Sequence, residues 1–255
     1  MLNLARPVSY VFPLKRVGAI VAPMIPIIAH RTCPLDAPEN SLAGIRKAAE
    51  LGADAVEIDV RRTLGGVPVL MHDWSPRRTA GLPGAVHWYP MWLLRMRGLE
   101  GTSERTPTFA QALDALSGGL QMAVEIKDAT AARRVLRIIR ERNMSARVMM
   151  WSYREAAVRL FAQEAPEIES SLLRDDIDPE GLARFLSDAK AWGARGISAH
   201  WKAINPPFVA EAHQRGLKVY SWIRDLESVA KKVSCGMDGI VTNQPREVRS
   251  ILQGS

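Results

Sequence analysis

The sequence predicts an α/β fold, a (β/α)₈ TIM barrel, on three observations. Short β-branched runs alternate with amphipathic segments from residue 26 onward, a pattern typical of parallel strands covered by helices. Nine such runs occur, but two of them lie too close together for a parallel crossover, which leaves eight barrel strands. The length of 255 residues suits one barrel, so we expect a single domain over residues 1–255.

The expected strands and helices alternate along the chain. The strands are Ile27–His30, Ala55–Val60, Val67–His72, Gln121–Lys127, Arg147–Trp151, Ser170–Leu173, Gly196–His200, Leu217–Trp222 and Asp238–Thr242. The clearest helices between them are Ser41–Leu51, Ala131–Arg142, Arg154–Gln163 and Gly181–Trp192.

The closely spaced strands predict a β-hairpin at the barrel mouth. Only a dozen residues separate Asp59 from His72, with two glycines, Gly65 and Gly66, in the middle. A Gly-Gly turn between two alternating runs favours a hairpin, so we expect the second run to fold back after the second barrel strand. Residues 74–106 are rich in Gly, Pro and Arg and predict a short loop insertion, with one helical turn around Met91–Met96.

Composition favours a folded protein that binds an anion. Lys+Arg number 34 against 27 Asp+Glu, a formal charge of +7, and arginine supplies 26 of the 34 basic residues. Arginine pairs readily with phosphate, although a compositional habit of the genome would give the same excess. No zinc finger, heptad repeat or aromatic RNA-binding pattern occurs. We therefore expect a small-molecule partner and no nucleic acid, and the oligomeric state stays open.

The N-terminal segment and the cysteines bear on location. Val17–Ile28 is apolar but contains two prolines and is too short for a membrane span. The basic residues before it resemble a signal peptide only weakly. The two cysteines, Cys33 and Cys235, form no C-x-x-C motif, and we expect free thiols at opposite ends of the barrel. These observations favour a cytoplasmic location.

Charged side chains gather at the ends of two neighbouring strands. Alternation along a strand puts Glu57 with Asp59, and Glu125 with Lys127, opposite the apolar residues. In a barrel that face is the interior, near the mouth where active sites lie. Three confined carboxylates repel one another unless a cation lies between them, and oxygen ligands favour Mg²⁺ or Ca²⁺. The alternative is an inert ion-pair network of Glu57 with Lys127 or Arg61.

The histidines add candidates for proton transfer. Two of the five, His30 and His72, are expected at the mouth beside the carboxylates. His200 ends a strand and is a weaker candidate for lining the same pocket. His87, in the insertion, and His213, on a helix, are expected to be structural.

Short motifs follow one another in a set order from residue 26. They are Ile27-Ile28-Ala29-His30-Arg31, Pro38-Glu39-Asn40-Ser41, Glu57-Ile58-Asp59-Val60, Val69-Leu70-Met71-His72-Asp73, Val124-Glu125-Ile126-Lys127, Ser221-Trp222 and Asp238-Gly239-Ile240-Val241-Thr242. In this order they resemble the glycerophosphodiester phosphodiesterase family. The resemblance implies a (β/α)₈ barrel, one divalent ion, and hydrolysis of glycerophosphodiesters to an alcohol and glycerol 3-phosphate, a reaction of lipid and glycerol metabolism.

The resemblance also implies roles for single residues. His30 and His72 match the acid–base pair of the family. Glu57, Asp59 and Glu125 match its metal ligands, and the choice between Mg²⁺ and Ca²⁺ stays open. The attacking oxygen is either water or a neighbouring hydroxyl of the substrate.

Three further residues match the family's substrate pocket, and two positions depart from its pattern. Arg31 matches the phosphate-binding arginine, Lys127 the lysine near the phosphate, and Trp222 the aromatic wall. Thr32 stands where the family usually has Gly, and its β-carbon is expected to narrow the approach to the phosphate or to shift the loop. The hairpin turn of the family usually carries Asp-Gly, whereas this chain has Gly65-Gly66. This difference is neutral for the turn.

Two other functions stay open. The first is a lysophospholipase D acting on lysolipids, in which apolar residues of the insertion contact a membrane. Those residues are Trp88, Tyr89, Met91, Trp92, Leu93 and Leu94. Residues of this kind more often pack on the barrel, so a membrane surface is the less favoured partner. The second is a non-catalytic barrel that binds a phosphorylated ligand or a protein, for which Thr32 is the only support.

Overall fold

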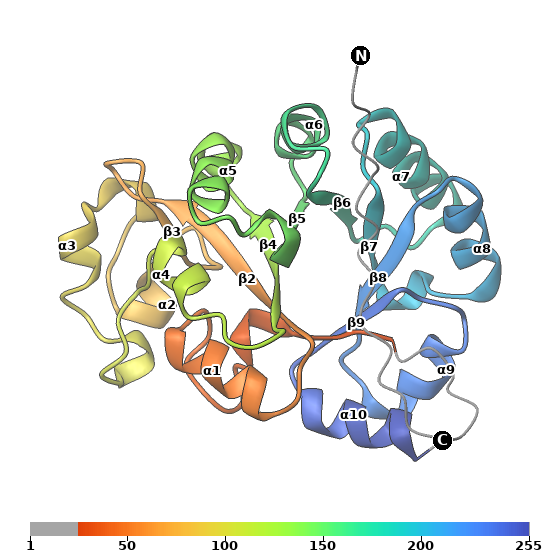
Figure 1. Ribbon diagram of the computed structural model, residues 1–255, viewed down its shortest axis with the longest axis horizontal. Helices are drawn as coiled ribbons and strands as arrows, with labels where there is room; N and C mark the ends of the chain where they lie inside the picture. Colours follow the sequence, from red (N-terminus) through yellow and green to blue (C-terminus); the bar gives the residue numbers. More distant parts are fainter. Residues whose placement is uncertain (1–24, 255) are drawn as a thin grey trace.

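The computed structural model describes residues 25–254, and in them eight parallel strands close into a barrel (Figure 1). The strands are β1 (Ile27–Ala29), β2 (Ala55–Arg62), β4 (Gln121–Ile126), β5 (Val148–Ser152), β6 (Glu169–Arg174), β7 (Gly196–His200), β8 (Lys218–Trp222) and β9 (Gly239–Thr242). Their order around the barrel is β1-β9-β8-β7-β6-β5-β4-β2, and β1 pairs with β2 to close it. The predicted fold class is confirmed.

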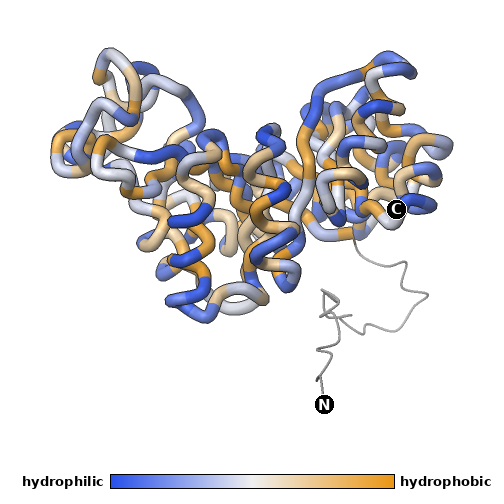
Figure 2. The backbone as a smooth tube through the Cα atoms, turned by 90° about the horizontal axis from the view of Figure 1, so that it is seen from above, coloured by the Kyte–Doolittle hydropathy of each residue, from blue (hydrophilic) through white to orange (hydrophobic). Residues whose placement is uncertain are grey.

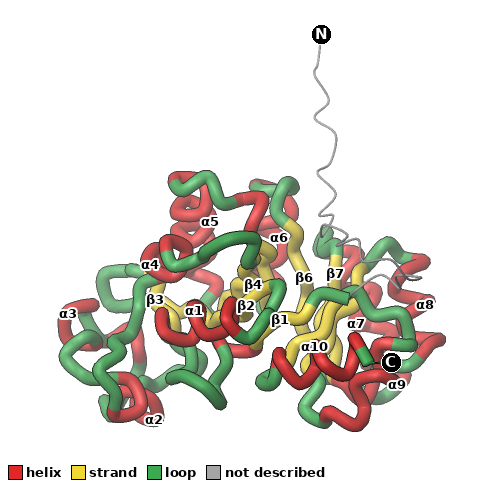
Figure 3. Tube along the Cα trace, turned by 60° about the horizontal axis from the view of Figure 1, so that its bottom comes forward, coloured by secondary structure: helices red, strands yellow, loops and turns green. Residues whose placement is uncertain are grey.

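A helix follows each barrel strand and covers the outside of the barrel (Figure 3). The helices are α1 (Leu42–Glu50), α4 (Phe109–Asp114), α5 (Ala132–Glu141), α6 (Glu155–Glu164), α7 (Pro179–Ala191), α8 (Pro206–Gln214), α9 (Val229–Val233) and α10 (Pro245–Gln253). Short 3₁₀ turns are η1 (His30–Thr32), η2 (Val86–Trp88), η3 (Leu99–Gly101), η4 (Ala129–Ala131), η5 (Ser145–Arg147), η6 (Trp201–Ala203) and η7 (Leu226–Ser228).

Local sequence accounts for several helix starts. The Ser41 hydroxyl accepts a hydrogen bond from the backbone N–H of Gly44, and the Asp178 carboxylate accepts one from that of Gly181. Thr108 and Gln111 form a capping box at the start of α4. These side chains satisfy backbone donors that the first helical turn leaves without partners. These three helices therefore begin where a short polar residue ends the preceding loop.

The segment after β2 departs from the barrel pattern. Strand β3 (Pro68–Leu70) runs antiparallel to the end of β2, with Arg61 opposite Val69. The insertion that follows holds two short helices, α2 (Arg77–Ala80) and α3 (Met91–Leu94), and lies at the left edge of Figure 1. The prediction of one helical turn was thus incomplete. His30 and His72 also lie just outside the strands in which they were expected, because β1 and β3 end earlier.

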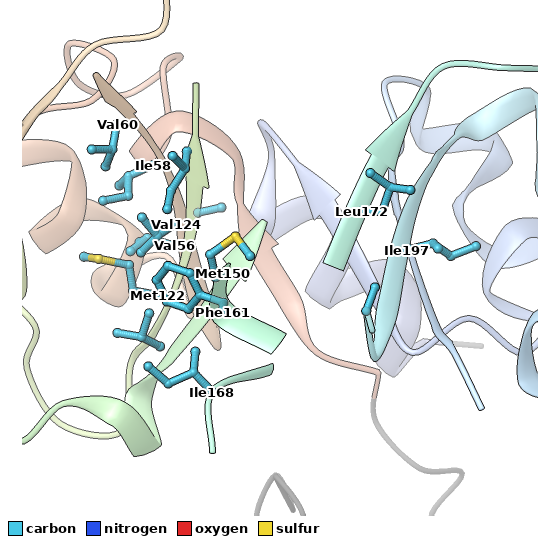
Figure 4. Close-up of a cluster of buried hydrophobic side chains, with 14 of the residues drawn as sticks. Val56, Ile58, Val60, Met122, Val124, Met150, Phe161, Ile168, Leu172 and Ile197 are labelled. Atoms are coloured by element: carbon cyan, nitrogen blue, oxygen red, sulfur yellow. The ribbon is translucent and has the colours of Figure 1, made fainter. Parts of the chain in front are cut away.

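The two faces of the barrel strands bury different sets of residues. Val56, Ile58 and Val124 face outward and pack with helix residues such as Phe161 of α6 (Figure 4). The alternate positions face the barrel interior, where Ala55, Ala123 and Tyr220 belong to a separate cluster. Strand alternation thus sends the charged residues between these apolar positions into the barrel, as predicted.

Thr32 lies against helix α1. Its side chain is buried, and its hydroxyl accepts a hydrogen bond from the backbone N–H of Ser41 at 3.3 Å. A β-carbon on Gly44 would lie 2.3 Å from the Thr32 hydroxyl, so only glycine leaves room for this threonine. Thr32 has φ of 64° and is absent from the residues that line the mouth cavity. The expectation that its β-carbon narrows the approach to the site is therefore wrong, because the Thr32 side chain packs against Gly44 of α1 and does not line the cavity.

The predictions about the cysteines and about membrane-spanning helices can be tested only in residues 25–254. Cys33 follows β1, Cys235 precedes β9, and both are free thiols, as predicted. No helix among residues 25–254 is long and apolar enough to cross a membrane. The weak signal-peptide pattern lies in residues 1–24, outside the described part of the chain.

Candidate active site

A cavity of about 560 Å³ opens at the carboxyl ends of the barrel strands. All eight site residues predicted from the sequence line it, and they come from segments far apart in the chain. They are His30, Arg31, Glu57, Asp59, His72, Glu125, Lys127 and Trp222. His200, the weaker candidate, lines the same cavity. The fold therefore brings the whole predicted set together.

Three buried carboxylates form the floor of the cavity. Asp59 of β2 pairs in register with Glu125 of β4. Glu57 lies two residues before Asp59 on β2 and faces the same side of the strand. Each residue offers an oxygen within 4.8 Å of the other two. Burial raises the pKa of Glu57, and repulsion from Asp59 and Glu125 raises it further. Burial and Asp59 together raise the pKa of Glu125 to about 7. Such a site favours protons or a cation.

Asp59 is the carboxylate with the most partners. Its Oδ2 accepts a hydrogen bond from Asn40 Nδ2 at 2.8 Å, and its backbone N–H donates to Asn40 Oδ1 at 2.9 Å. Lys127 Nζ lies 3.1 Å from Asp59 Oδ1. Burial alone would raise the pKa of Asp59, but Lys127, His72 and Arg31 hold it below its usual value. Asp59 therefore stays ionised.

Two cations border the carboxylates. Lys127 Nζ lies 2.6 Å from Glu125 Oε1, and the Arg31 backbone N–H donates to Glu57 Oε2 at 2.8 Å. The Arg31 guanidinium reaches Asp59 Oδ2 at 3.7 Å from its Nε. Burial opposes the charge on Lys127, yet the neighbouring carboxylates raise its pKa. Both side chains are thus cationic groups at the edge of the site.

His30 is held in one orientation by contacts on two sides. Its Nδ1 lies 2.7 Å from Asn243 Oδ1, and its ring stacks on Trp222 with centroids 4.5 Å apart. Because an amide oxygen only accepts, Nδ1 carries the hydrogen and Nε2 has the free lone pair. Burial, followed by the charge of Arg31, lowers the pKa of His30 to about 4. At neutral pH this histidine is uncharged and able to accept a proton.

His72 has a charged partner instead. Its Nδ1 lies 2.8 Å from Asp73 Oδ1, and Arg61 Nε donates to its backbone carbonyl at 3.0 Å. Burial holds the pKa of His72 below its usual value, although Asp59 and the bond to Asp73 oppose that shift. The carboxylate partner stabilises the protonated ring, which distinguishes His72 from His30.

A chain of ion pairs links His72 to the insertion, and it was not predicted. Arg78 of α2 donates to Asp73 Oδ2 at 2.7 Å and to both oxygens of Glu39, at 2.6 and 2.9 Å. Burial opposes ionisation of Asp73, but its bonds to Arg78 and His72 lower its pKa to about 2. Glu39 belongs to the motif Pro38-Glu39-Asn40-Ser41, which resembles the family, so the sequence did point to this residue. Arg78 had none, because its partners are set only by the fold.

Another part of the cavity wall comes from the ends of β5, β6 and β8. The Tyr153 hydroxyl donates to Asp175 Oδ2 at 3.1 Å, and the ring lies 5.8 Å from Lys127 Nζ. Arg224 lies over the Trp222 ring, 4.8 Å from its centroid. This wall combines aromatic rings with charges of both signs, and it leaves room beside the carboxylates for a small polar molecule.

Comparison with known proteins gives one consistent result. The model of the glycerophosphoryl diester phosphodiesterase family matches residues 30–247. A glycerophosphodiester phosphodiesterase of Caldanaerobacter subterraneus subsp. tengcongensis is 26% identical over 240 residues, which cover 89% of this chain and 97% of the relative. The human glycerophosphodiester phosphodiesterase 1 is 56% identical over only 55 residues, 22% of this chain and 17% of the relative.

Solved structures show the same fold. An Oleispira antarctica phosphodiesterase, in complex with the product sn-glycerol-3-phosphate, superposes with a TM-score of 0.80 at 23% identity and covers 90% of this chain and 97% of its own. A glycerophosphodiester phosphodiesterase from Thermotoga maritima has a TM-score of 0.76 at 20% identity and covers 91% of this chain and 100% of its own. At these identities the likeness concerns the barrel itself.

Proposed function

The chain belongs to the glycerophosphoryl diester phosphodiesterase family, and on that premise we propose that its mouth cavity hydrolyses glycerophosphodiesters to an alcohol and glycerol 3-phosphate with the help of a divalent cation. One observation carries this proposal. Three buried carboxylates within 4.8 Å of one another line the same cavity as His30 and His72.

The carboxylates fit a divalent cation. They offer only oxygen ligands, and the pKa of Glu57 and that of Glu125 are raised because each lies buried beside other negative charges. Hard oxygen ligands suit Mg²⁺ or Ca²⁺ better than zinc. Glu57, Asp59 and Glu125 would hold the ion. Such an ion neutralises charge on the phosphoryl oxygens and lowers the barrier to attack.

Arg31 and Lys127 supply positive charge beside these carboxylates. A phosphodiester is an anion, and it repels an attacking oxygen unless its charge is offset. Lys127 Nζ, 2.6 Å from Glu125, and the Arg31 guanidinium border the place where the phosphate would lie. These two residues bind and orient the phosphate. Trp222, stacked on His30, forms an aromatic wall of the substrate pocket.

We propose different roles for the two histidines from their different partners. His30 presents a free lone pair at Nε2 and accepts the proton of the attacking hydroxyl, as a general base. His72, whose protonated form Asp73 stabilises, donates its proton to the oxygen of the leaving alcohol as the P–O bond breaks. General acid–base catalysis contributes about 10²–10⁴ in rate, so the cationic groups must supply the rest of the acceleration.

Two observations bear on the alternative functions. The non-catalytic barrel rested on Thr32, which packs against Gly44 and does not line the cavity. The lysophospholipase D hypothesis needs a lysolipid as substrate, which lipid contact by the insertion would not by itself establish, whereas the family and its relatives support glycerophosphodiesters. Hydrolysis of water-soluble diesters is therefore the better supported function. We also propose, as the sequence predicts, a single catalytic domain over residues 1–255. A cytoplasmic location is part of the same proposal.

The deciding experiment measures release of glycerol 3-phosphate from glycerophosphocholine, glycerophosphoethanolamine and glycerophosphoglycerol. Each substrate is assayed with Mg²⁺, with Ca²⁺ and with chelator, and lysophosphatidylcholine is included for comparison. We expect cation-dependent release from the soluble diesters. Activity on the lysolipid alone would favour the lysophospholipase D, and inactivity of a folded, metal-bound protein on every substrate would contradict the proposal.

Leaving-group dependence tests the histidine roles. A p-nitrophenyl ester of glycerol 3-phosphate has a leaving group that needs no general acid. His72→Ala should therefore lose about 10²–10⁴ in kcat on glycerophosphocholine but less than about tenfold on the p-nitrophenyl ester. His30→Ala should lose activity on both. The opposite pattern would exchange the two roles.

A further inference from the structure

Large apolar side chains that face solvent are confined to one end of the described barrel. Four of them lie in the insertion: Trp74, Trp88, Trp92 and Met96, each more than half exposed. The other four lie after β1, in the β2–β3 turn, after β5 and after β6, and they are Leu35, Leu64, Tyr153 and Ile177. All eight therefore follow the carboxyl ends of barrel strands. Exposed apolar patches of this kind mark interaction surfaces.

The insertion has an inner side that packs on the hairpin and an outer side that does not. Val86 and Leu94 are buried in a cluster with Val69 and Met71. Trp88 is only two residues after Val86, yet it is 60% exposed, and Trp92 is 67% exposed. The tryptophans are thus not needed to attach the insertion to the barrel.

The outer side is also preorganised. The ring of Trp88 lies so close to Gly84 that a β-carbon there would be 2.5 Å from it, and Gly84 has φ of 78°. The rings of Trp74 and Trp88 meet edge to face, with centroids 5.8 Å apart. An exposed ring that is held by its own segment loses little conformational freedom when it binds a surface.

The insertion has two acids and five exposed arginines, which differ in their partners. Glu104 accepts from the backbone N–H of Ala43 at 3.2 Å and lies 3.6 Å from Arg46, so it is turned toward α1, whereas Glu100 is exposed. Arg78 pairs with Asp73 and Glu39, and Arg105 donates to nearby backbone carbonyls. The other three, Arg77, Arg95 and Arg97, form no ion pair with a described residue. We call these three arginines with Trp74, Trp88, Trp92 and Met96 the insertion face. In Figure 2 this lobe, at the left, carries hydrophobic and hydrophilic residues side by side.

We infer that the insertion face docks the enzyme on the surface of an anionic lipid bilayer, with its tryptophan rings in the headgroup region and its arginines against lipid phosphates. Tryptophan prefers the membrane interface, and arginine is attracted to anionic leaflets. Docking here would hold the cavity mouth close to the lipid surface, because both lie at the same end of the barrel. The inference concerns binding and does not require hydrolysis of a lipid.

A second copy of the chain fits this face less well. A two-fold interface would bring the three arginines of one insertion face against the three of the other, and like charges at short range repel. A flat anionic surface meets the rings and the arginines at once. The lipid bilayer is therefore the occupant that matches both features.

The test is co-sedimentation of the full chain with vesicles. We compare phosphatidylcholine alone with phosphatidylcholine containing about 30% phosphatidylglycerol. Partitioning onto the anionic vesicles should be about 100-fold stronger at low salt, and it should weaken as salt screens the arginines. Absence of binding to the anionic vesicles at low salt would overturn the inference.

Variants separate the two contributions. Arg95→Glu with Arg97→Glu should reduce partitioning at least tenfold, whereas Arg133→Glu with Arg137→Glu, on the exposed side of α5, should change it far less. Trp88→Ser with Trp92→Ser should reduce it about tenfold. Circular dichroism and glycerophosphocholine hydrolysis of the insertion variants should match the parent protein, which separates this test from the proposed function.

Sedimentation velocity distinguishes the remaining occupants. We expect the parent protein and the Trp88→Ser, Trp92→Ser variant to have the same oligomeric state. A parent dimer that becomes a monomer in that variant, without any vesicle binding, would assign the face to a second copy and overturn the lipid inference. Equal vesicle binding by parent and variants would overturn it as well.

Discussion

The two ends of the barrel interior both bury charged side chains, but only one of them balances its charges. At the amino-terminal end, Glu169 of β6 accepts from Lys218 Nζ at 2.7 Å and from the Tyr220 hydroxyl at 2.6 Å. At the mouth, two partly buried cations, Lys127 and Arg31, lie beside three buried carboxylates. Burial and Glu169 raise the pKa of Tyr220, so it stays a neutral donor. The first cluster is complete within the described residues, while the second has negative charge to spare.

This difference separates a structural polar cluster from a functional one. A buried carboxylate with one ammonium and one hydroxyl needs nothing more, and removing a partner damages the fold. Carboxylates in excess are unfavourable for the fold and become useful only when a cation binds. Net charge within a cluster, more than the presence of charged residues, therefore identifies the site.

The largest effect is expected for Glu125→Gln at the mouth. The change removes one proposed metal ligand, so kcat/KM should fall by about 10³ or more and cation affinity should weaken. It also removes a carboxylate whose pKa is raised by burial and by Asp59, so the metal-free protein should be no less stable. Steady-state kinetics and thermal unfolding in chelator measure both effects. Activity within tenfold of the parent would contradict the assignment of Glu125.

Glu169→Gln should have the reverse outcome. Lys218 loses its carboxylate, and because its side chain is 36% exposed, we expect a loss of about 2–4 kcal/mol in unfolding free energy, below that of a fully buried pair. The kcat of the folded fraction should not change. Urea unfolding measures the loss, and Glu169→Leu with Lys218→Met and Tyr220→Phe, which leaves no polar group of this cluster without a partner, should recover much of it. A large fall in kcat with normal stability would remove the contrast between the two ends.

Asp73→Asn tests whether the outer partners of the mouth act on the reaction. Asp73 is a positioning residue for His72, which it reaches at 2.8 Å. Without the charge of Asp73 the pKa of His72 should fall, so His72 loses its proton at a lower pH. The alkaline limb of the pH–rate profile then shifts to lower pH. We expect kcat to fall about 100-fold, with KM little changed. Asp73→Glu should restore part of the rate, and an unchanged pH profile would mean that Asp73 is only structural.

The smallest effect is a pH dependence of the metal-free fold. The pKa of Glu125 is about 7 in the folded protein, above its usual value, because burial and Asp59 disfavour the ionised form. The folded state therefore binds this proton more tightly than the unfolded state, and stability rises as pH falls from 8 through 7. We expect Tm in chelator to rise by about 2–4 °C between pH 8 and pH 6.

Two comparisons isolate that pH effect. Glu125→Gln should reduce it, because one of the two carboxylates with a raised pKa is gone. Saturating cation should reverse it, because the ion competes with protons for the same oxygens and binds best when they are ionised. A Tm in chelator that falls from pH 8 to pH 6 would show that other groups dominate.

Much of the site follows from local patterns in the sequence. Alternation along β2 and β4 is enough to place Glu57, Asp59 and Glu125 on the interior face, because side chains of a strand point to opposite sides in turn. The Gly65-Gly66 turn predicts a hairpin from local backbone preferences, and β3 does run antiparallel to β2. The order of the motifs indicated the family, which the match over residues 30–247 shows.

Other features depend on contacts between distant residues, and only the tertiary structure decides them. Asn243 meets His30 across 213 positions, and Arg78 joins Glu39 across 39, so no local pattern announces either bond. Trp92 and Leu94 are large side chains only two positions apart, yet one is exposed and the other buried. A pattern of residue types determines which face of a strand or helix is apolar. Which partner covers that face, and which charge lacks one, is set by how the whole chain packs.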